Sequence, residues 1–331
     1  MPATPHREPA APLASLMLIT FNQQHSVADA IRGALSQTWT PLEVLISDDA
    51  STDDTFAIAE KCVSGYDGPH TVRLFRNETN LGISAHLSAL AARASGQLLF
   101  VAAGDDISMP QRCERVMNAW IESGKRYGLI ATDLQDLDAA GNVHDILTVT
   151  DLSGYQGFDD WSRSRPHVVG AAHAWARRLF TEFGPMEPGI YGEDQIMVFR
   201  AIMSGGAFTL REPLVQYRRG GLSRKRRWRT PGEFVARIKL ANVNGTGETR
   251  QLQRDANRVG AGDKMRALLA KKAAREEYVA AVFSNQPLSR KLAMLVGAAN
   301  VSAGFRIRMF VYATCPWLLS PFFFIKWHLR A

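Results

Sequence analysis

The sequence predicts an open α/β fold with a mostly parallel central sheet flanked by helices, followed by a basic, mostly helical extension. From Ser15 onwards, short apolar runs alternate with amphipathic stretches, as in parallel sheets covered by helices on both faces. Polar clusters follow successive apolar runs, at the strand ends where open α/β sheets bind ligands. A length of 331 residues with 46% hydrophobic content provides a substantial core and excludes a disordered chain.

The predicted elements alternate regularly through the first third of the chain. Strands are expected at 15–20, 42–47, 71–77 and 97–102, and helices at about 26–36, 53–64 and 83–94. Pro110 then lies in the first turn of a further helix, where its missing N–H costs little. After Gly128 the alternation weakens, and two later strands are expected at 129–138 and 207–218.

The two ends of the chain differ in composition. Residues 224–331 hold 21 Lys and Arg against 6 Asp and Glu, whereas residues 1–223 hold 18 against 26. The segment from about 233 to 283 is expected to be mostly helical, with an interruption at NVNGTGE. We therefore expect a disordered tail over 1–14, one domain over 15–223 and a basic helical extension over 224–331.

Targeting and redox signals are weak in this sequence. The Pro- and Ala-rich start has no apolar stretch before Leu16, so it does not resemble a secretory signal. The three cysteines are far apart and odd in number, which indicates a reducing compartment rather than a disulfide framework.

Polar side chains follow four successive predicted strands. The clusters are Thr20-Phe21-Asn22, Asp48-Asp49 with the following Ala-Ser-Thr-Asp, Asn80 with Gly82, and Gly104-Asp105-Asp106. Because the carboxyl ends of parallel strands share one edge of the sheet, these groups are expected to converge. Carboxylates there accept hydrogen bonds from a base or a ribose, and a carboxylate pair can hold Mg²⁺ or Mn²⁺ against a diphosphate. A single Asp such as Asp53 also fits a turn or a helix N-cap, but four clusters in succession favour a binding site.

The order TFN, SQTWTPLEVLISDDASTDDT, NLG and GDDISMP resembles the family-two inverting nucleotide-sugar glycosyltransferases with the GT-A fold, over roughly residues 15–223. The resemblance implies a Rossmann-like GT-A sheet and a pocket for a nucleoside-diphosphate sugar. It implies that Thr20, Phe21 and Asn22 border the nucleotide. It also implies that Asp48 and Asp49 contact the base and the ribose, and that Asn80 and Gly82 line the same pocket. Asp49 is the first choice for the base.

The GDD sequence departs from the family's DxDD form, because Ala103 stands where the first Asp would be. Asp105 and Asp106 remain as implied ligands of Mn²⁺ or Mg²⁺, with Asp105 also beside the nucleotide sugar. Which of the two ligates the ion directly stays open. Relatives often carry a His after the Tyr-Arg pair, where this chain has Gly-Gly at 220–221. His173 is an alternative ligand, although a lone His in such a segment is more often packed or on the surface.

Asp194 is the implied general base. The Gly-Glu-Asp sequence that precedes an apolar helical run resembles the family's Glu-Asp motif, whose Asp accepts a proton from the acceptor hydroxyl. Inversion requires such a base on the face opposite the diphosphate. The sequence is equally compatible with a structural role for Asp194, as an acidic residue that interacts with the dipole at a helix N-terminus. Arg218, Arg219 and Arg224 fit either diphosphate contacts or solvated surface positions.

The implied function is transfer of a hexosyl or related glycosyl group, with a UDP-sugar favoured as donor. The acceptor would be a saccharide or lipid-linked saccharide in cell-surface polysaccharide or glycolipid biosynthesis. The alternative is a non-catalytic nucleotide-sugar or glycan-binding protein that retains the fold, supported by the missing Asp and His.

A processive synthase is excluded, because its Gln-x-x-Arg-Trp motif would have Arg224 at the Gln position. No nucleic-acid partner is expected, since the basic charge lacks an aromatic stacking pattern.

The segment 309–325 is free of charged residues and has basic flanks. A membrane-spanning helix needs about 20 apolar residues, and Pro316 and Pro321 interrupt this shorter run. The pattern favours a segment that lies in the membrane interface, with a buried core helix as the alternative. We therefore expect a cytoplasmic protein with peripheral contact on the inner face of the cell membrane, where anionic lipid attracts the basic extension.

Overall fold

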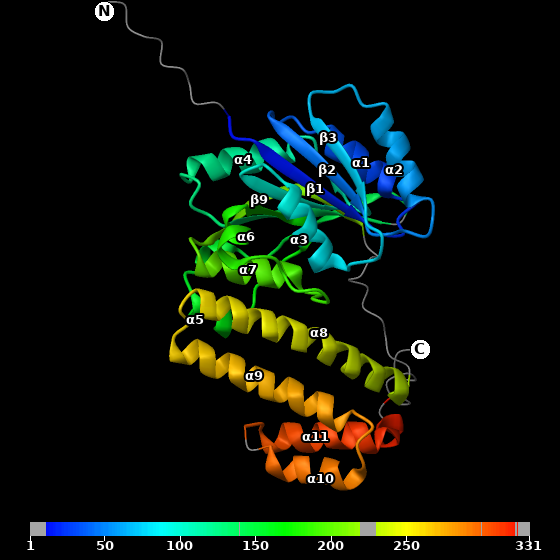
Figure 1. The fold of residues 1–331 in the computed structure, drawn as a ribbon, viewed down its shortest axis with the longest axis vertical. Helices are drawn as coiled ribbons and strands as arrows, with labels where there is room; N and C mark the ends of the chain where they lie inside the picture. The colour runs from blue at the N-terminus through cyan, green and yellow to red at the C-terminus, as the bar shows by residue number, and fades with distance from the viewer. Residues whose placement is uncertain (1–10, 139, 219–229, 299, 322, 324–331) are drawn as a thin grey trace, which may run out of the picture. The chain divides into compact units, whose positions relative to one another are not determined.

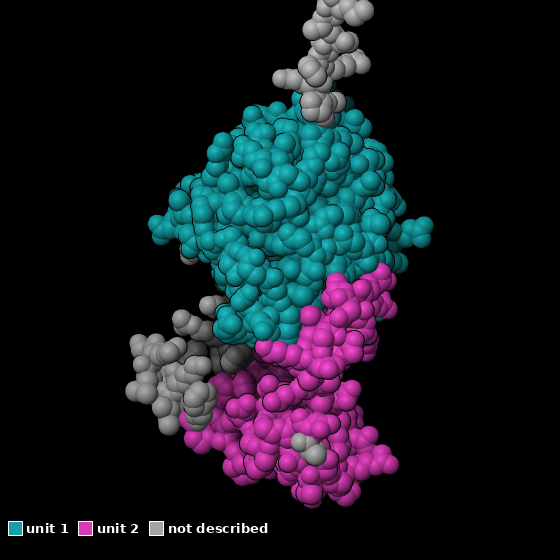
Figure 2. All heavy atoms as spheres, turned by 90° about the vertical axis from the view of Figure 1, so that its left-hand side faces the viewer, with its two compact units in different colours: residues 1–188, 193–223 teal, residues 189–192, 224–331 magenta. Residues whose placement is uncertain are grey.

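The computed structural model describes residues 11–138, 140–218, 230–298, 300–321 and 323. It divides into two compact units, one of residues 1–188 and 193–223 and the other of residues 189–192 and 224–331 (Figure 2). Some predictions fall outside the described residues: those on the tail over 1–10, on Arg219 and the Gly-Gly pair, and on the basic run at 224–229.

Within the described residues, the first unit is built on a nine-stranded sheet. Its strands are β1 (Ala14–Thr20), β2 (Leu42–Asp48), β3 (Thr71–Arg76), β4 (Leu98–Ala103), β5 (Ile107–Ser108), β6 (Leu129–Leu137), β7 (Val143–Leu147), β8 (His173–Ala176) and β9 (Ala207–Arg218). They follow the order β3-β2-β1-β4-β8-β6-β9-β5, with β7 paired to β6. Figure 1 shows β3, β2 and β1 side by side. The pairs β3-β2, β2-β1 and β1-β4 are parallel, which confirms the predicted parallel sheet in this half.

The other half of the sheet is mixed. Strand β8, which the sequence pattern did not predict, is antiparallel to both β4 and β6. It has only four residues, all buried, so it shows no alternation of polar and apolar side chains. Strand β9 runs parallel to β6 and antiparallel to β5, which follows the GDD sequence. The end of β9 is thereby brought beside the GDD segment.

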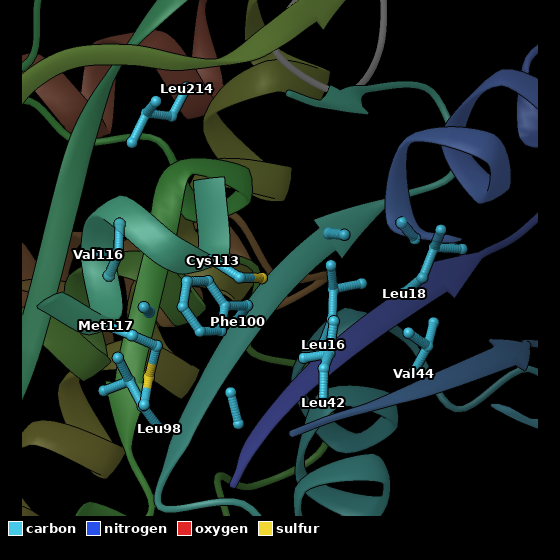
Figure 3. Packing of buried hydrophobic residues seen from close by; sticks show 14 of the residues in the cluster. Leu16, Leu18, Leu42, Val44, Leu98, Phe100, Cys113, Val116, Met117 and Leu214 are labelled. Carbon is cyan, nitrogen blue, oxygen red and sulfur yellow. The ribbon is translucent and has the colours of Figure 1, made fainter. Parts of the chain in front are cut away.

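Helices pack on both faces of the sheet. They are α1 (Val27–Leu35), α2 (Thr55–Ser64), α3 (Ile83–Arg93), α4 (Arg112–Glu122), α5 (Phe158–Arg163), α6 (Arg178–Phe183) and α7 (Glu193–Met203), with 3₁₀ turns η1 (Leu152–Gly154) and η2 (Gly170–Ala172). One face packs alternate strand residues such as Leu16 and Phe100 against Val116 and Met117 of α4 (Figure 3). On the other face, His86 of α3 lies against Ser47 of β2, with 2.7 Å between Nε2 and Oγ.

The second unit is helical in its described residues. Its helices are α8 (Pro231–Arg258), α9 (Asp263–Val282), α10 (Leu288–Gly297) and α11 (Ala303–Thr314), followed by the 3₁₀ turn η3 (Pro316–Leu319). Helix α8 starts with Pro231 at its first position, and Thr230 Oγ1 accepts a hydrogen bond from Glu233 N at 3.2 Å. These groups satisfy the helix start locally, which the sequence Thr-Pro-Gly-Glu encodes.

The predicted interruption at NVNGTGE is wrong, because α8 runs through this segment without a break. The physical reason is packing against α9. Asn242 Nδ2 donates to Glu276 O at 2.9 Å and to Glu276 Oε2 at 2.6 Å. A Cβ on Gly245 would lie 2.8 Å from Glu276 Oε1, so the glycine makes room for this contact. The tertiary contacts outweigh the low helix propensity of Asn and Gly.

The C-terminal helices share a small apolar cluster. Its buried members are Tyr278, Val279, Val282, Phe283, Val301 and Met309. Phe323 is also buried, and its ring lies 5.9 Å from that of Phe234 between centroids. Part of the segment 309–325 therefore packs in a core. Among the described residues, no helix has both the length and the apolarity that crossing a membrane requires.

Candidate active site

The end of β1 is joined to the end of β2 by Asn22. Its backbone N donates to Ser51 Oγ at 2.9 Å, and its side-chain Oδ1 accepts from Thr52 N at 2.9 Å. Asn22 adopts a φ of 51°, a left-handed conformation that Asn tolerates better than most residues. The neighbouring Phe21 is 44% exposed and presents an apolar ring at this edge. The first two polar clusters thus meet, as the sequence predicts for a parallel sheet.

Asp49 organises the loop that carries the third cluster. Its Oδ1 accepts hydrogen bonds from Asn77 Nδ2 at 2.7 Å and from Leu81 N at 2.9 Å. Its Oδ2 accepts from Gly82 N at 3.0 Å, and Asn80 Oδ1 accepts from the same N–H at 3.0 Å. Gly82 has a φ of +76°, which favours glycine. The position that the sequence assigns to base contact therefore also holds the loop around Asn80 and Gly82 in place.

Asp48 is fully buried and faces a cation. Its Oδ2 accepts from Ser51 N at 2.9 Å and lies 3.4 Å from Arg76 Nε. Its Oδ1 has no hydrogen-bond partner within the described part of the chain. Arg76 also donates from Nη2 to Ser51 O at 2.9 Å and lies over the Phe56 ring, 4.8 Å from its centroid. This part of the site therefore combines a buried carboxylate oxygen that lacks a hydrogen-bond donor with the half-exposed guanidinium of Arg76.

The turn formed by the GDD sequence packs closely against the end of β1. Gly104 N donates to Ile19 O at 2.9 Å, and Ser26 Oγ donates to Gly104 O at 2.8 Å. A Cβ at Gly104 would lie 2.5 Å from Thr20 Oγ1, so no other residue fits without a shift. This close approach brings the fourth polar cluster to the first.

Arg218 at the end of β9 holds the two aspartates of the GDD sequence. Its backbone N donates to Asp106 Oδ1 at 2.8 Å, and its Nε donates to Asp105 O at 3.1 Å. Its Nη2 lies 3.4 Å from Asp29 Oδ2, so its side chain also reaches α1. The sequence offered a diphosphate contact or a solvated surface position for Arg218. In the structure its side chain is mostly buried and engaged with the protein.

The two aspartates have perturbed acidities. Burial, and then the charge of Asp105, raises the pKa of Asp106 well above its ordinary value. Burial also raises the pKa of Asp105, against the lowering effects of its hydrogen bonds and of Arg218. Two neighbouring carboxyl groups in this environment disfavour each other's charged form. Within the described residues, no group of three or more His, Cys, Asp or Glu is arranged to hold a metal ion.

Arg112 and His173 lie in the core near the GDD segment. Arg112 donates to Ser108 Oγ at 2.9 Å, to Val101 O at 2.9 Å and to Ala171 O at 2.7 Å. His173 is fully buried, and its Nδ1 lies 3.4 Å from Trp175 Nε1. Burial and the charge of Arg112 lower the pKa of His173 to about 3, so this ring is neutral. His173 is therefore a packed core residue, which is the more common role of a lone His in such a segment.

The Glu193-Asp194 pair begins α7. Glu193 is 7% exposed, and a Cβ on Gly170 would lie 2.8 Å from its Oε1, so the glycine makes room for the carboxyl group. Burial and then the charge of Asp194 raise the pKa of Glu193 to about 8. The half-buried Asp194 accepts from Gln195 N at 2.7 Å through Oδ1. Asp194 is thus in contact with the N-terminus of α7.

Comparison with known proteins identifies the family. Residues 15–182 match the family model described as glycosyl transferase family 2. The chain belongs to this family. It is 30% identical over 132 residues to the putative glycosyltransferase EpsE of Bacillus subtilis, a match that covers 40% of this chain and 46% of that protein. It is 28% identical over 132 residues to chondroitin synthase of Escherichia coli, covering 40% of this chain and 18% of that one. The matched region thus spans less than half the length of either relative.

Solved structures share the fold of this family-2 member. TarS 1–349 from S. aureus in complex with UDP-GlcNAc has a TM-score of 0.52 at 14% identity, covering 90% of this chain and 86% of that chain. The mannosyltransferase PcManGT from Pyrobaculum calidifontis, in complex with GDP-Man and Mn2+, has a TM-score of 0.51 at 14% identity, covering 93% and 86%. At this identity the likeness concerns the fold, and it confirms the predicted GT-A architecture.

Sequence reasoning missed several residues of the site in this family-2 chain. Arg76 pairs with Asp48 in the β2–β3 register, so its place at the end of the neighbouring strand was a usable signal. Asn77, which also contacts Asp49, directly follows the same strand and offered a similar signal. Arg112 offered none, because its role depends on contacts between segments distant in sequence.

Proposed function

We propose that this chain transfers a glycosyl group from a nucleoside-diphosphate sugar, with a UDP-sugar favoured, to a saccharide or lipid-linked saccharide. The setting would be cell-surface polysaccharide or glycolipid biosynthesis. The observation that carries the proposal is the convergence of three strand ends at one edge of a family-2 fold: Asn22 binds the segment after β2, and Gly104 abuts Thr20. A nucleotide, its diphosphate and a cation require such a concentration of polar groups.

Residues 15–223 are proposed as the catalytic domain, and residues 224–331 as an extension that contacts the inner face of the cell membrane. The boundary agrees with the division of the chain into two compact units. The strong positive charge of residues 224–331 supports a contact with anionic lipid, which attracts each nearby cation by about 1 kcal/mol.

The nucleotide is proposed to lie along Thr20, Phe21 and Asn22, with Asn80, Gly82 and the Asp48-Asp49 pair around it. A carboxylate has about four acceptor positions, and Asp49 uses three of them for donors of its own chain. We assign the fourth position to an N–H of the base, on a carboxyl group whose Oδ2 also lies 3.9 Å from His86 Nδ1. The exposed ring of Phe21 provides an apolar surface beside it.

Asp105 and Asp106 are proposed to hold Mn²⁺ or Mg²⁺. The pair fits a divalent cation, because both carboxyl groups are oxygen ligands and burial together with mutual repulsion raises the pKa of Asp106. When bound, such an ion neutralises charge on the diphosphate leaving group. The contacts of Arg218 with Asp106 Oδ1 and Asp105 O orient the pair from the protein side.

Asp194 is proposed as the general base that accepts the proton of the acceptor hydroxyl during inversion. The pKa of its neighbour Glu193 is raised to about 8, so at pH 7 Glu193 keeps its proton and adds no negative charge beside Asp194. A charged carboxylate next to a neutral one is suited to accept a proton.

The test is donor binding and turnover by the full chain. Nucleoside-diphosphate sugars are screened by thermal shift with and without Mn²⁺, and release of nucleoside diphosphate is then measured with candidate acceptors. We expect one donor to raise the unfolding temperature in the presence of Mn²⁺ and to be consumed, with inverted anomeric configuration in the product. Binding without any release, even by slow hydrolysis, would instead support the non-catalytic alternative.

A further inference from the structure

Helix α10 exposes apolar side chains where helices of water-soluble proteins usually expose polar ones. Leu288, Leu292 and Val296 recur at intervals of four residues and are 57%, 46% and 82% exposed. None of the residues of α10 is buried. Residues four apart lie on the same side of a helix, so the three side chains form one stripe.

The opposite side of α10 is packed, so the stripe is not part of a loose core. Met294 and Ala298 contact the apolar cluster of the C-terminal helices. Arg306 of α11 donates from Nη1 to Leu295 O at 2.7 Å and to Val296 O at 2.8 Å, which satisfies carbonyl groups at the end of α10. The helix is held from the inside, and its outer side remains apolar.

From residue 278 onwards the sequence carries only basic charges, and the nearest preceding acidic residues are Glu276 and Glu277 of α9. Residues 278–331 hold no Asp or Glu, and their cations are Arg290, Lys291, Arg306, Arg308, Lys326 and Arg330. Arg290 and Lys291 belong to α10 itself, between Leu288 and Leu292. An apolar helix face with basic residues and no acidic ones is typical of helices that lie in the interface of an anionic membrane.

The apolar run 309–325 is less suited to this contact than its composition suggests. Met309 and Phe323 are 8% and 7% exposed, and Phe310 and Tyr312 pack partly against the same cluster. A side chain committed to a protein core is not available to lipid. Within the run, Trp317 and Leu318 are 65% and 50% exposed, but they lie in the short turn η3, so the longer exposed apolar stripe is that of α10.

We propose that the outer face of α10, formed by Leu288, Leu292 and Val296, docks on an anionic lipid surface, to which the basic charge of residues 224–331 attracts it. The helix lies in the membrane plane, with its apolar side chains at the boundary between headgroups and acyl chains. This proposal deepens the membrane contact proposed above by naming its surface, and it does not depend on sugar transfer.

The test uses the full chain and vesicles of phosphatidylcholine with or without phosphatidylglycerol, in a co-sedimentation assay. The variant L292E/V296E is compared with L240E/V243E on α8, where Leu240 and Val243 are 51% and 65% exposed. Both variants make the same two chemical changes on helices of the same unit. We expect the wild type and L240E/V243E to bind anionic vesicles, and L292E/V296E to lose at least about tenfold in partition coefficient. Salt is expected to weaken the binding.

Four results overturn the proposal: no binding by the wild type, equal binding to vesicles without phosphatidylglycerol, wild-type binding by L292E/V296E, or an equal loss in L240E/V243E. A wild-type dimer in analytical ultracentrifugation that L292E/V296E dissociates, without vesicle binding, would assign the face to a second copy instead. Circular dichroism and thermal unfolding check that both variants fold. Donor turnover without vesicles is measured in parallel, so a failure of the enzymatic proposal appears separately as absent turnover in every sample.

Discussion

Two Asp-Asp pairs follow two strands of the same sheet, yet their surroundings differ. Asp48 and Asp49 accept hydrogen bonds from backbone N–H groups of their own loops, Asp49 also accepts one from Asn77, and Asp48 forms an ion pair with Arg76. Asp106 accepts one backbone N–H, from Arg218, and burial together with the charge of Asp105 raises its pKa. In the first pair the chain supplies three hydrogen bonds to Asp49, although Asp48 Oδ1 has no partner within the described residues. In the second pair, burial and the charge of Asp105 outweigh the nearby charges of Arg112 and Arg218 on Asp106.

The difference shows that position at a strand end does not determine the role of a carboxylate. What matters is how many donors the chain itself supplies. A carboxylate with its own donors stabilises a loop, while a buried carboxylate short of donors is poised for a cation or ligand. Glu193 and Asp194 are a third adjacent acidic pair, in which burial and then the charge of Asp194 raise the pKa of Glu193 to about 8.

The largest expected effect is on catalysis by the second pair. Asp106→Asn removes a proposed metal ligand, and we expect kcat/KM to fall by about a thousandfold or more, since a metal supplies several kcal/mol of charge stabilisation. Asp54→Asn is the control, because Asp54 is exposed at the start of α2 and makes no side-chain cap hydrogen bond. Steady-state release of nucleoside diphosphate measures both. Retained activity in Asp106→Asn removes the assignment of this pair to the cation.

The next effect concerns the third pair. Asp194→Asn is expected to lower kcat by about 10²- to 10⁴-fold, the usual contribution of a general base, while the donor Kd stays unchanged. Glu193→Gln is the matched change at the neighbouring position, and it should keep most of the activity because Glu193 is already neutral at pH 7. Kinetics and donor titration by calorimetry separate the two. Equal losses in both variants contradict a base at Asp194.

Stability sharpens the contrast between the first two pairs. Asp49→Asn replaces one acceptor oxygen by an amide donor, so at least one loop N–H loses its partner, and we expect a loss of about 1–3 kcal/mol in the free energy of unfolding. Asp106→Asn keeps an oxygen for Arg218 N and removes a buried carboxyl group, so we expect it to be at least as stable as the wild type at pH 7. Urea unfolding without added metal measures both. The opposite ranking would reverse the roles inferred for the two pairs.

The smallest expected effect is on the pH dependence of stability. Glu193 has its pKa raised to about 8 in the folded state, from an ordinary value of 4.5. Between these values the folded state holds a proton that the unfolded state has lost, so this group makes stability fall as pH rises from about 4.5 to 8. Glu193→Gln removes this contribution. Unfolding temperatures measured at pH 5 and pH 8 should therefore differ less in the variant than in the wild type, and an unchanged difference contradicts the raised pKa.

The amino-acid sequence by itself determined the α/β class, the four parallel strands, and the four polar clusters at their ends. Each of these depends on a local pattern: an apolar run of strand length, a helical period, or a polar group directly after a strand. Strand β1 begins at Ala14, one residue before the predicted start, and β2 to β4 lie within a residue or so of their predicted bounds. The family motifs lie on the same local segments.

Only the tertiary structure decided the features that join distant segments. The unbroken path of α8 depends on Glu276 of α9, and the restraint of the GDD pair depends on Arg218, more than a hundred residues downstream. Which apolar residues of the extension stay exposed depends on how α10 and α11 pack, so Met309 is buried and Val296 is not. A local pattern cannot specify these outcomes, because hydrogen bonds and burial between segments depend on which surfaces the whole fold brings together.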